Sequence, residues 1–418
     1  MINKDFYREL NPIEISLLTE IEKIKIVDCH EHLMSEKDRV NLYVDAFTLF
    51  SHYTSADFVV SGMSESDRWE IFPSIEKGWK PQKSLDERFK LFKPFYENIK
   101  HSSYARAAHI AMKKFYNINE LNEETVHLLS ERIQSNNTQG LYDRVLKDAC
   151  NMEYCMSQGC ISDGDLMTSV SWVPNIPKEL EEIKYWTGSE VGSFDDFLET
   201  ISQKIKHIKD SNYIGVKQFI TPLSSDLPNY NNAKTLFNDL KTEKTTCLEK
   251  INPFTDFIYD YIAKEVAKYD LVFCIHTGYW GDFRDLNPSY ILPLASRNKD
   301  TKFDLYHLGY PYVKESIILG KCQQNIWLNM CWTYIISQKF AEDALYELLE
   351  MVPVNKILGF GGDYFIVEKI FGHLTMARES IARVLGKKIE EKTLSFDDSI
   401  IIARKILNEN PKFLYNLK

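Results

Sequence analysis

Several features are missing from this chain of 418 residues, and each absence excludes a class of protein. The eight cysteines form no Cys-x-x-Cys pair and several lie in apolar runs, which excludes a disulfide-rich secreted scaffold and favours reduced thiols. No basic stretch suits a phosphate backbone, and the net charge is -10, so nucleic acid is not an expected partner. No apolar run approaches the roughly 18 residues of a membrane span. The initial MINKDFYREL lacks the apolar segment of a signal peptide. We therefore expect a cytoplasmic protein without a membrane partner.

Short apolar runs alternate with long helical patterns over most of the chain. Most of these runs are nearly continuous rather than alternating, which is typical of strands covered on both faces of a parallel sheet. Strand followed by helix, repeated along the chain, indicates an α/β fold. Hydrophobic residues make up 44% of the chain, which is ample for one large core or two ordinary domains. The predicted strands are residues 24–30, 167–173, 214–220, 271–276, 302–307, 325–330 and 356–363.

One region interrupts this alternation, because residues 36–163 contain helical patterns and almost no strand. Ser84 and Glu87 have the spacing of a capping box, and amphipathic stretches of helical period follow. No Gly/Ser-rich linker, internal repeat or low-complexity segment separates this region from the rest. We therefore predict three parts: residues 1–35 with the first helix and strand, residues 36–163 as a large helical insertion packed over the barrel, and residues 164–418 as the remainder of the barrel.

Polar residues with metal-binding chemistry lie at or near the ends of the predicted strands. In a (β/α)₈ barrel the carboxyl ends of all strands meet at one face, so residues distant in sequence would converge there. Several histidines with a carboxylate form a ligand set for Zn²⁺ or another first-row divalent ion. The candidates are His30, His32, Lys217, His276, His307 and Asp363.

Each of these residues also has an ordinary structural interpretation. The His-x-His pair shares one face of a strand because the side-chain period is two, and such a pair alone can be a polar strand edge. His276 or His307 alone could be a hydrogen-bonded histidine, Asp363 a turn or N-cap residue, and Lys217 a solvated lysine at a strand end. The joint pattern, in one consistent order along the chain, favours a metal site.

These residues and their order resemble the amidohydrolase superfamily of metal-dependent (β/α)₈ barrels over nearly the whole chain. The stretches FDLYHLGYP, NIWLNMCW and KILGFGGDYF are similar to the branch that includes amidohydrolase-2 decarboxylases and hydrolases. The helical insertion after the first strand and the closing ARKILNENPKFLY are similar to uronate isomerases and their relatives. The resemblance specifies the fold and leaves the reaction open, because this superfamily hosts several chemistries on one scaffold.

The resemblance also implies roles for the candidate ligands. His30, His32 and Asp363 would hold a first metal, most simply zinc, with manganese or iron as alternatives, and His276 joins them in single-metal members. In two-metal members a carboxylated lysine bridges both ions. Lys217 occupies the matching position of the fourth strand, and His276 and His307 would then hold the second metal. Uronate isomerases lack this lysine ligand, which argues against that activity.

The chemistry expected of such a centre is hydrolysis of an amide, lactone or ester in a small polar or carboxylated substrate. A bound metal lowers the pKa of its water towards about 7. Asp363 would accept the proton as the water attacks, and His307 or the metal would polarise the carbonyl. The alternatives are a decarboxylase or uronate isomerase-like enzyme on the same residues, and a non-catalytic barrel used for binding.

Residues beyond the strand ends and in the helical insertion are candidates for the substrate pocket. An arginine in a bidentate pose recognises carboxylate or phosphate, so the substrate is expected to be acidic or polar. Each aromatic could instead pack in the core or an interface, and each arginine could form a surface ion pair. Acidic barrels of this kind often associate, so a homo-oligomer is expected. The pocket candidates are Arg68, Tyr104, Arg106, Trp280, Arg284, Tyr312 and Trp332.

Overall fold

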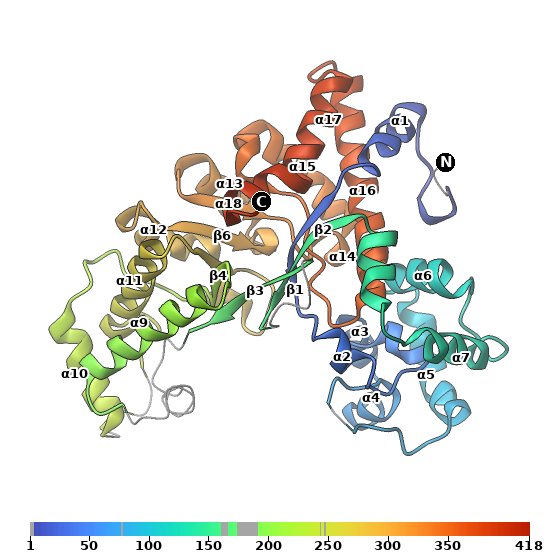
Figure 1. Ribbon diagram of the computed structural model, residues 1–418, viewed down its shortest axis with the longest axis horizontal. Coiled ribbons are helices and arrows are strands. Elements are labelled where there is room, and N and C mark those ends of the chain that lie inside the picture. Colours follow the sequence, from blue (N-terminus) through green and yellow to red (C-terminus); the bar gives the residue numbers. More distant parts are fainter. Residues whose placement is uncertain (1–3, 77, 160–165, 174–190, 243, 246–247) are drawn as a thin grey trace. The chain divides into compact units, whose positions relative to one another are not determined.

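The computed structural model describes residues 4–76, 78–159, 166–173, 191–242, 244–245 and 248–418 (Figure 1). Contacts between residues divide the chain into two compact units, each built from segments distant in sequence. Unit 1 comprises Met1–Met167, Cys331–Tyr346 and Gly359–Asn408. Unit 2 comprises Thr168–Met330, Glu347–Leu358 and Glu409–Lys418.

The strands form one eight-stranded sheet in the order β1-β2-β3-β4-β5-β6-β7-β8, and every neighbouring pair whose register is described is parallel. This arrangement confirms the predicted (β/α)₈ barrel. Strands β1, β5 and β7 are buried along their whole length, as their continuous apolar runs predicted. The strands are β1 Ile26–Glu31, β2 Met152–Gln158, β3 Met167–Trp172, β4 Gly215–Phe219, β5 Val272–His276, β6 Lys302–Tyr306, β7 Ile326–Asn329 and β8 Ile357–Leu358.

The structure corrects one boundary of the predicted helical insertion. Strand β2 lies inside the range 36–163 that the sequence had assigned to helices, so the helical segment ends at Ala149. Its sequence, MEYCMSQ, mixes buried and half-buried positions and contains no continuous apolar run, which hid it from a search for buried strands. The predicted boundary at 163–164 itself falls in residues 160–165, outside the described residues.

Between β1 and β2, unit 1 is helical as predicted. Ser84 caps α5 through the expected capping box with Glu87. A core of buried aromatic residues, which includes Phe50, Phe58 and Phe92, joins these helices. The helices of this stretch are α2 Glu36–Arg39, α3 Tyr53–Val60, α4 Glu65–Ile71, α5 Leu85–Ile99, α6 Ser103–Tyr116 and α7 Val126–Asn136, followed by the π-helix η3 Asp143–Ala149.

The long helix α16 (Val367–Glu390) packs along α6 in unit 1 (Figure 1). The two backbones approach closely at Gly372, where an added Cβ would lie 2.1 Å from the carbonyl oxygen of Ala107. This close approach fixes the side chains that α16 directs towards the helical segment. Unit 1 also contains α1 Pro12–Ile21, α14 Thr333–Ile336 and α17 Phe396–Arg404, while α15 Gln338–Met351 contributes to both units.

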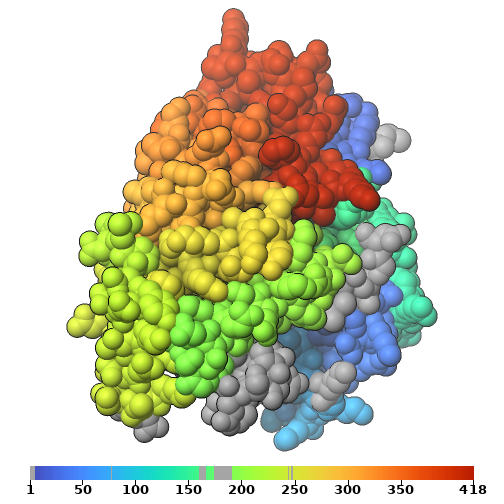
Figure 2. Space-filling view, turned by 60° about the vertical axis from the view of Figure 1, so that its left-hand side comes forward, coloured from blue at the N-terminus to red at the C-terminus, as the bar shows by residue number. Residues whose placement is uncertain are grey.

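In unit 2, helices α9 (Phe194–Asp210), α10 (Tyr230–Lys241) and α11 (Pro253–Lys268) lie side by side. They share a cluster of phenylalanines in which the Phe197 ring stacks on Phe237 and on Phe254. Their residues form a continuous part of the surface, coloured green to yellow in Figure 2. Unit 2 also contains α12 Leu292–Arg297, α13 Val313–Cys322 and α18 Asn410–Tyr415. Over the part of the chain that the structure describes, no helix has the length and apolar character to cross a bilayer.

Candidate metal centre

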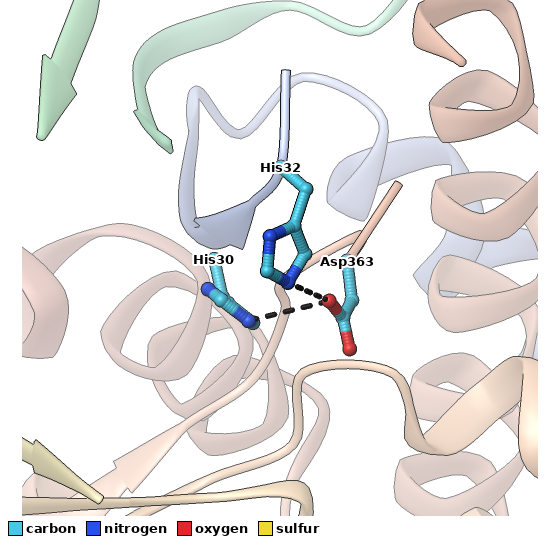
Figure 3. Close-up of side chains that lie close together, drawn as sticks. All are labelled: His30, His32 and Asp363. Atoms are coloured by element: carbon cyan, nitrogen blue, oxygen red, sulfur yellow. Dashed lines mark ion pairs between the residues drawn. The ribbon is translucent and has the colours of Figure 1, made fainter. Parts of the chain in front are cut away.

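Three of the predicted ligands meet in unit 1 (Figure 3). His30 and His32 belong to β1 and the residue after it, and Asp363 lies in the segment that follows β8. The Oδ1 atom of Asp363 lies 3.2 Å from Nε2 of His30 and 3.1 Å from Nε2 of His32. One ligand atom from each residue falls within 4.8 Å of the others, so the cluster can share a single ion. The sequence therefore located the members of a compact polar cluster.

The donor set of this cluster fits a first-row divalent metal. Two imidazole nitrogens and one carboxylate oxygen, all facing one point, form the two-histidine, one-carboxylate arrangement that leaves coordination positions open. Asp363 and His30 are each 1% exposed, while the side chain of His32 is 25% exposed. Burial alone would raise the pKa of the Asp363 carboxyl, but the His30 imidazole and hydrogen bonds from both histidines hold it well below its ordinary value. The carboxyl is thus ionised, as a metal ligand must be.

Two further carboxyls, Asp28 and Glu31, contact the backbone next to the cluster and are fully buried. Asp28 accepts backbone hydrogen bonds from His30 and Gly362, and Glu31 accepts one of 2.6 Å from Tyr364. Burial raises the pKa of Asp28 to about 7 and that of Glu31 well above its usual value, with the neighbouring carboxyl also contributing at Glu31. These two acids therefore hold the backbone N–H groups of Gly362 and Tyr364, the residues on either side of Asp363.

The backbone around Asp363 depends on close packing against β1. A Cβ on Gly362 would lie 1.9 Å from Oε1 of Glu31, so only glycine fits there. Asp363 itself has a φ of +62° and donates its backbone N–H to the carbonyl oxygen of His30. From the sequence, Asp363 alone could have been a turn residue, whereas the structure shows that the glycine before it permits a close approach to the Glu31 side chain.

Sequence reasoning missed His52 and Tyr53, which begin α3. The Tyr53 hydroxyl is hydrogen-bonded to Asp363, and burial together with this carboxylate raises the pKa of Tyr53 well above its ordinary value. Burial, followed by the nearby Lys369 ammonium, lowers the pKa of His52 well below its ordinary value. At neutral pH the phenol is therefore protonated and the imidazole is neutral. The only sequence signal was the polar SHYT stretch within an otherwise helical segment.

The segment with His52 and Tyr53 is held in place by α16. Lys369, which is fully buried, donates hydrogen bonds to the backbone oxygen of Ser51 and to the hydroxyl of Thr54. Burial lowers the pKa of Lys369 to about 7. His52 adopts a φ of +61° between these two anchored residues.

Aromatic side chains continue from the cluster to a cavity of about 320 Å³ in unit 1. The Phe365 ring lies 5.2 Å from the ring of His32 and 4.5 Å from that of His52, and both Phe365 and His52 line the cavity. Arg68, a predicted pocket residue, also lines it. Its Nε donates to Ser55 and its Nη1 lies 3.2 Å from Glu65.

Two other predicted pocket residues, Trp332 and Tyr104, stack on Tyr53. The ring centroids lie 4.7 Å apart for Trp332 and 5.8 Å apart for Tyr104. Trp332 is 1% exposed and its backbone N–H donates to the carbonyl oxygen of Gly361. Both rings therefore border the hydroxyl that contacts Asp363.

His276 and His307 form a pair in unit 2. Nε2 of His307 lies 3.0 Å from Nδ1 of His276, and both residues are buried. His276 is the last residue of β5, and His307 follows β6 with a φ of +69°. Their assignment as metal ligands stays a prediction.

Lys217 also lies in unit 2, but at a deeper level of the barrel than His276. The register of β4 and β5 pairs Lys217 with Cys274, whereas Phe219 is level with His276. Nζ of Lys217 lies 3.5 Å from the centroid of the Tyr306 ring, and Lys217 is 1% exposed. These neighbours give Lys217 a place in the barrel interior, and its assignment as a carboxylated ligand stays a prediction.

The remaining predicted pocket residues have varied surroundings. Arg106 pairs with Glu379 at 2.7 Å between α6 and α16, which gives it a packing role in unit 1. In unit 2, Arg284 is largely exposed and pairs with Asp282. The Trp280 ring lies 6.4 Å from that of His276, and Tyr312 lies 6.3 Å from Phe283. Their substrate contacts stay predictions.

The fold and this cluster together define a parallel (β/α)₈ barrel with a two-histidine, one-carboxylate group beside its first strand. Among solved structures, the chain is similar to a uronate isomerase from Thermotoga maritima, with a TM-score of 0.80 and 15% identity over 99% of each chain. It is also similar to a glucuronate isomerase from Caulobacter crescentus, with a TM-score of 0.78 and 16% identity over 100% of this chain and 97% of that one.

A third similar structure is a protein from Lactobacillus casei to which a metal-dependent hydrolase function is ascribed. It has a TM-score of 0.65 and 14% identity over 96% of this chain and 97% of that one. No protein-family model and no curated protein matches the chain. The similarity therefore establishes the fold, including the helical segment after the first strand.

Proposed function

We propose that this chain is a metal-dependent enzyme of the amidohydrolase type, with one divalent first-row ion held by His30, His32 and Asp363. The observation that carries the proposal is the convergence of both imidazole Nε2 atoms on one buried, ionised carboxylate oxygen. When bound, the ion would polarise a substrate carbonyl or acidify a water molecule. The cavity lined by His52 and Phe365 offers space for a substrate next to this centre.

The side chains around the cluster suit proton transfer on a small polar substrate. Tyr53 is a protonated donor against Asp363, and His52 is a neutral imidazole that lies on the same short segment. Arg68 lines the adjacent cavity, where its guanidinium can contact a carboxylate of the substrate. Unit 1 thus contains a proton donor (Tyr53), a proton acceptor (His52) and a cation (Arg68). These are the groups required to move a proton between neighbouring carbon atoms of a sugar acid and to bind its carboxylate.

Within this class we favour isomerisation of an aldose-type acid to its ketose. The similarity to proteins named as uronate or glucuronate isomerases extends over almost the full length of both chains. The absence of a lysine ligand in such isomerases had argued against this activity. Isomerisation requires that Lys217 is not a ligand, which is compatible with its position level with Cys274 and over the Tyr306 ring.

Hydrolysis of an amide, lactone or ester is the second candidate. The two-histidine, one-carboxylate arrangement leaves positions for a water molecule, and Asp363 is the group that would accept its proton. The structure from Lactobacillus casei, to which a metal-dependent hydrolase function is ascribed, has the same fold.

Two measurements on the purified chain test this proposal. Elemental analysis should find about one equivalent of a first-row ion, because one set of three ligands is assigned. The metal-loaded protein is then incubated with hexuronates and followed by NMR for conversion of the aldehyde to the ketone. Parallel incubations with lactones and amides are followed for carboxylate release. Carboxylate release without ketone formation would show that the enzyme is a hydrolase rather than an isomerase. Activity of the metal-free protein in either assay would contradict the proposed metal dependence.

A further inference from the structure

A second cavity, of about 360 Å³, lies in unit 1 at the amino-terminal end of β1 and β2. Its wall includes Asn151, whose carbonyl oxygen accepts the backbone N–H of Ile26 where β1 begins. His30 lies four residues further along the same strand, about 13 Å away at the usual rise of a strand. The cavity therefore lies at the opposite end of β1 from the metal centre, and its size suits a small molecule.

The most unusual group in its wall is Arg378 of α16, which is 4% exposed. Its Nη2 donates to the carbonyl oxygen of Cys150, the C-cap residue of η3, at 2.8 Å. This hydrogen bond satisfies a carbonyl oxygen at the C-terminal, partly negative end of η3, and it uses one nitrogen of the guanidinium. Among the described residues, Nε has no hydrogen-bond partner and no carboxylate forms an ion pair with Arg378. Burial has the largest effect on the pKa of Arg378 and lowers it overall, although the charge of Glu22 acts to raise it. A buried guanidinium without a direct ion pair is costly, so this arrangement favours an anion from outside the chain.

A second cation, Lys114 of α6, lines the same cavity. Its Nζ lies 5.0 Å from the centroid of the Phe371 ring, and among the described residues no carboxylate pairs with it. The preceding Lys113 differs, because it pairs with Asp5 at 3.1 Å. Lys147 also lines the cavity, but its charge is compensated by Asp143 at 2.7 Å. Among the described residues of the wall, Arg378 and Lys114 are thus the cations without a direct ion pair.

Two acids, Glu22 and Asp148, and the amide of Asn151 complete the polar lining. Glu22 accepts a hydrogen bond of 2.6 Å from the Tyr7 hydroxyl, so its negative charge is partly satisfied. Carboxylates in the wall disfavour a ligand with several separate anionic groups, but they accept hydrogen bonds from hydroxyl groups. The lining therefore suits a ligand with one anionic group and neighbouring hydroxyls.

We propose that this cavity binds a small hydroxylated oxyanion, a phosphate or carboxylate compound, with its anionic group between Arg378 and Lys114 and its hydroxyls towards Glu22 and Asp148. The proposal is independent of the reaction at the metal centre. It assigns a ligand site to the end of the barrel where side chains usually serve stability.

Calorimetric titration of the full chain with inorganic phosphate and with glycerol 3-phosphate, at constant ionic strength, tests the proposal. We expect saturable binding, tighter for glycerol 3-phosphate. Lys114→Ala should weaken it by about tenfold, as for loss of one charge-assisted contact, and Lys113→Ala should leave it unchanged. Lys114 is exposed, so its replacement tests binding without disturbing the core. Arg378→Met also removes the bond to Cys150, and it should abolish binding in a protein whose circular dichroism matches wild type.

His30→Asn distinguishes the cavity from the metal centre, where phosphate could also bind. The proposal expects the same affinity for glycerol 3-phosphate in this variant. The proposal would be overturned if Lys114→Ala bound glycerol 3-phosphate as tightly as wild type, or if His30→Asn lost binding. It would also be overturned if titration with chloride gave the same heat of binding, because the heat would then reflect non-specific ion binding. A failure of the proposed enzymatic function would leave this titration unaffected, so the two proposals are separable.

Discussion

Two pairs of imidazoles in this protein have different electrostatic surroundings. In unit 1, His30 and His32 face the carboxylate of Asp363, and the pKa of that acid stays low despite its burial. In unit 2, His276 faces His307, and the two imidazoles share one hydrogen bond. A pair of imidazoles can satisfy each other when one is a donor and the other an acceptor, whereas two imidazoles aimed at one carboxylate oxygen leave a position suited to a cation.

The buried carboxyls of the two units differ in the same way. Asp304 of β6 accepts hydrogen bonds from Tyr415 and Asn329, yet burial raises its pKa to about 7. Asp363 is equally buried but stays ionised because positively polarised groups face it. Burial alone therefore does not distinguish a functional acid from a structural one. The groups that face the carboxyl distinguish them.

The largest expected effect is that of His30→Asn. Removal of one of three ligands should lower metal content from about one equivalent by more than tenfold and abolish turnover. Elemental analysis after gel filtration measures the first effect. His373→Gln is a useful control, because His373 is a buried histidine of the same unit bonded to the Gly362 carbonyl oxygen. Full metal retention in His30→Asn would place the ion elsewhere.

Tyr53→Phe should retain the metal and lose activity. The phenol donates towards Asp363 without belonging to the ligand set, so its loss should lower kcat by about 10²–10⁴-fold, the range of a general acid or base. Metal content and kcat are measured on the same preparation, and Tyr104→Phe serves as the stacking control. Unchanged kcat in Tyr53→Phe would remove the hydroxyl from the mechanism.

Asp304→Asn should change stability with pH in unit 2. The folded pKa of about 7 exceeds the ordinary 3.8, so the folded state binds the proton more tightly and loses stability as pH rises from about 4 to 7. Well above pH 7 the variant with the neutral amide should be more stable than the protein with the buried carboxylate, by up to about 4 kcal/mol. Urea unfolding at pH 5 and pH 8 measures the difference. A variant less stable than wild type at pH 8 would show that the carboxylate is well compensated.

The smallest expected change is the metal content of His276→Asn. Because His276 is paired with another imidazole, its replacement should leave about one equivalent of metal bound, within the precision of elemental analysis. The same measurement on His307→Asn completes the comparison. Loss of an ion in either variant would support the ligand roles that the sequence resemblance assigned to these histidines.

Much of the fold was predictable because parallel strands that are buried on both faces have continuous apolar sequences. The strand at 24–30 and that at 271–276 were found in this way, and both end in a histidine of interest. Strand β2 was missed because its residues mix buried and half-buried positions. The capping box at Ser84 was predictable from two residues, since its hydrogen bonds are local.

The roles of His52, Tyr53 and Glu31 could not be predicted in this way. Each acts through residues far along the chain: Tyr53 through Asp363, Glu31 through the Tyr364 backbone, and His52 through the charge of Lys369. Contacts across such separations leave no spacing pattern in a single sequence.

By itself, the sequence determined the repeated strand–helix order, the helical region after the first strand, and the His-x-His pair, because each depends on residues close together in the chain. Only the tertiary structure decided how closely Asp363 approaches this pair, that Lys217 lies level with Cys274, and that Arg378 is buried beside a cavity. The physical reason is that charge, burial and distance between remote side chains arise only when the backbone has folded, and these quantities control the chemistry of ionisable groups.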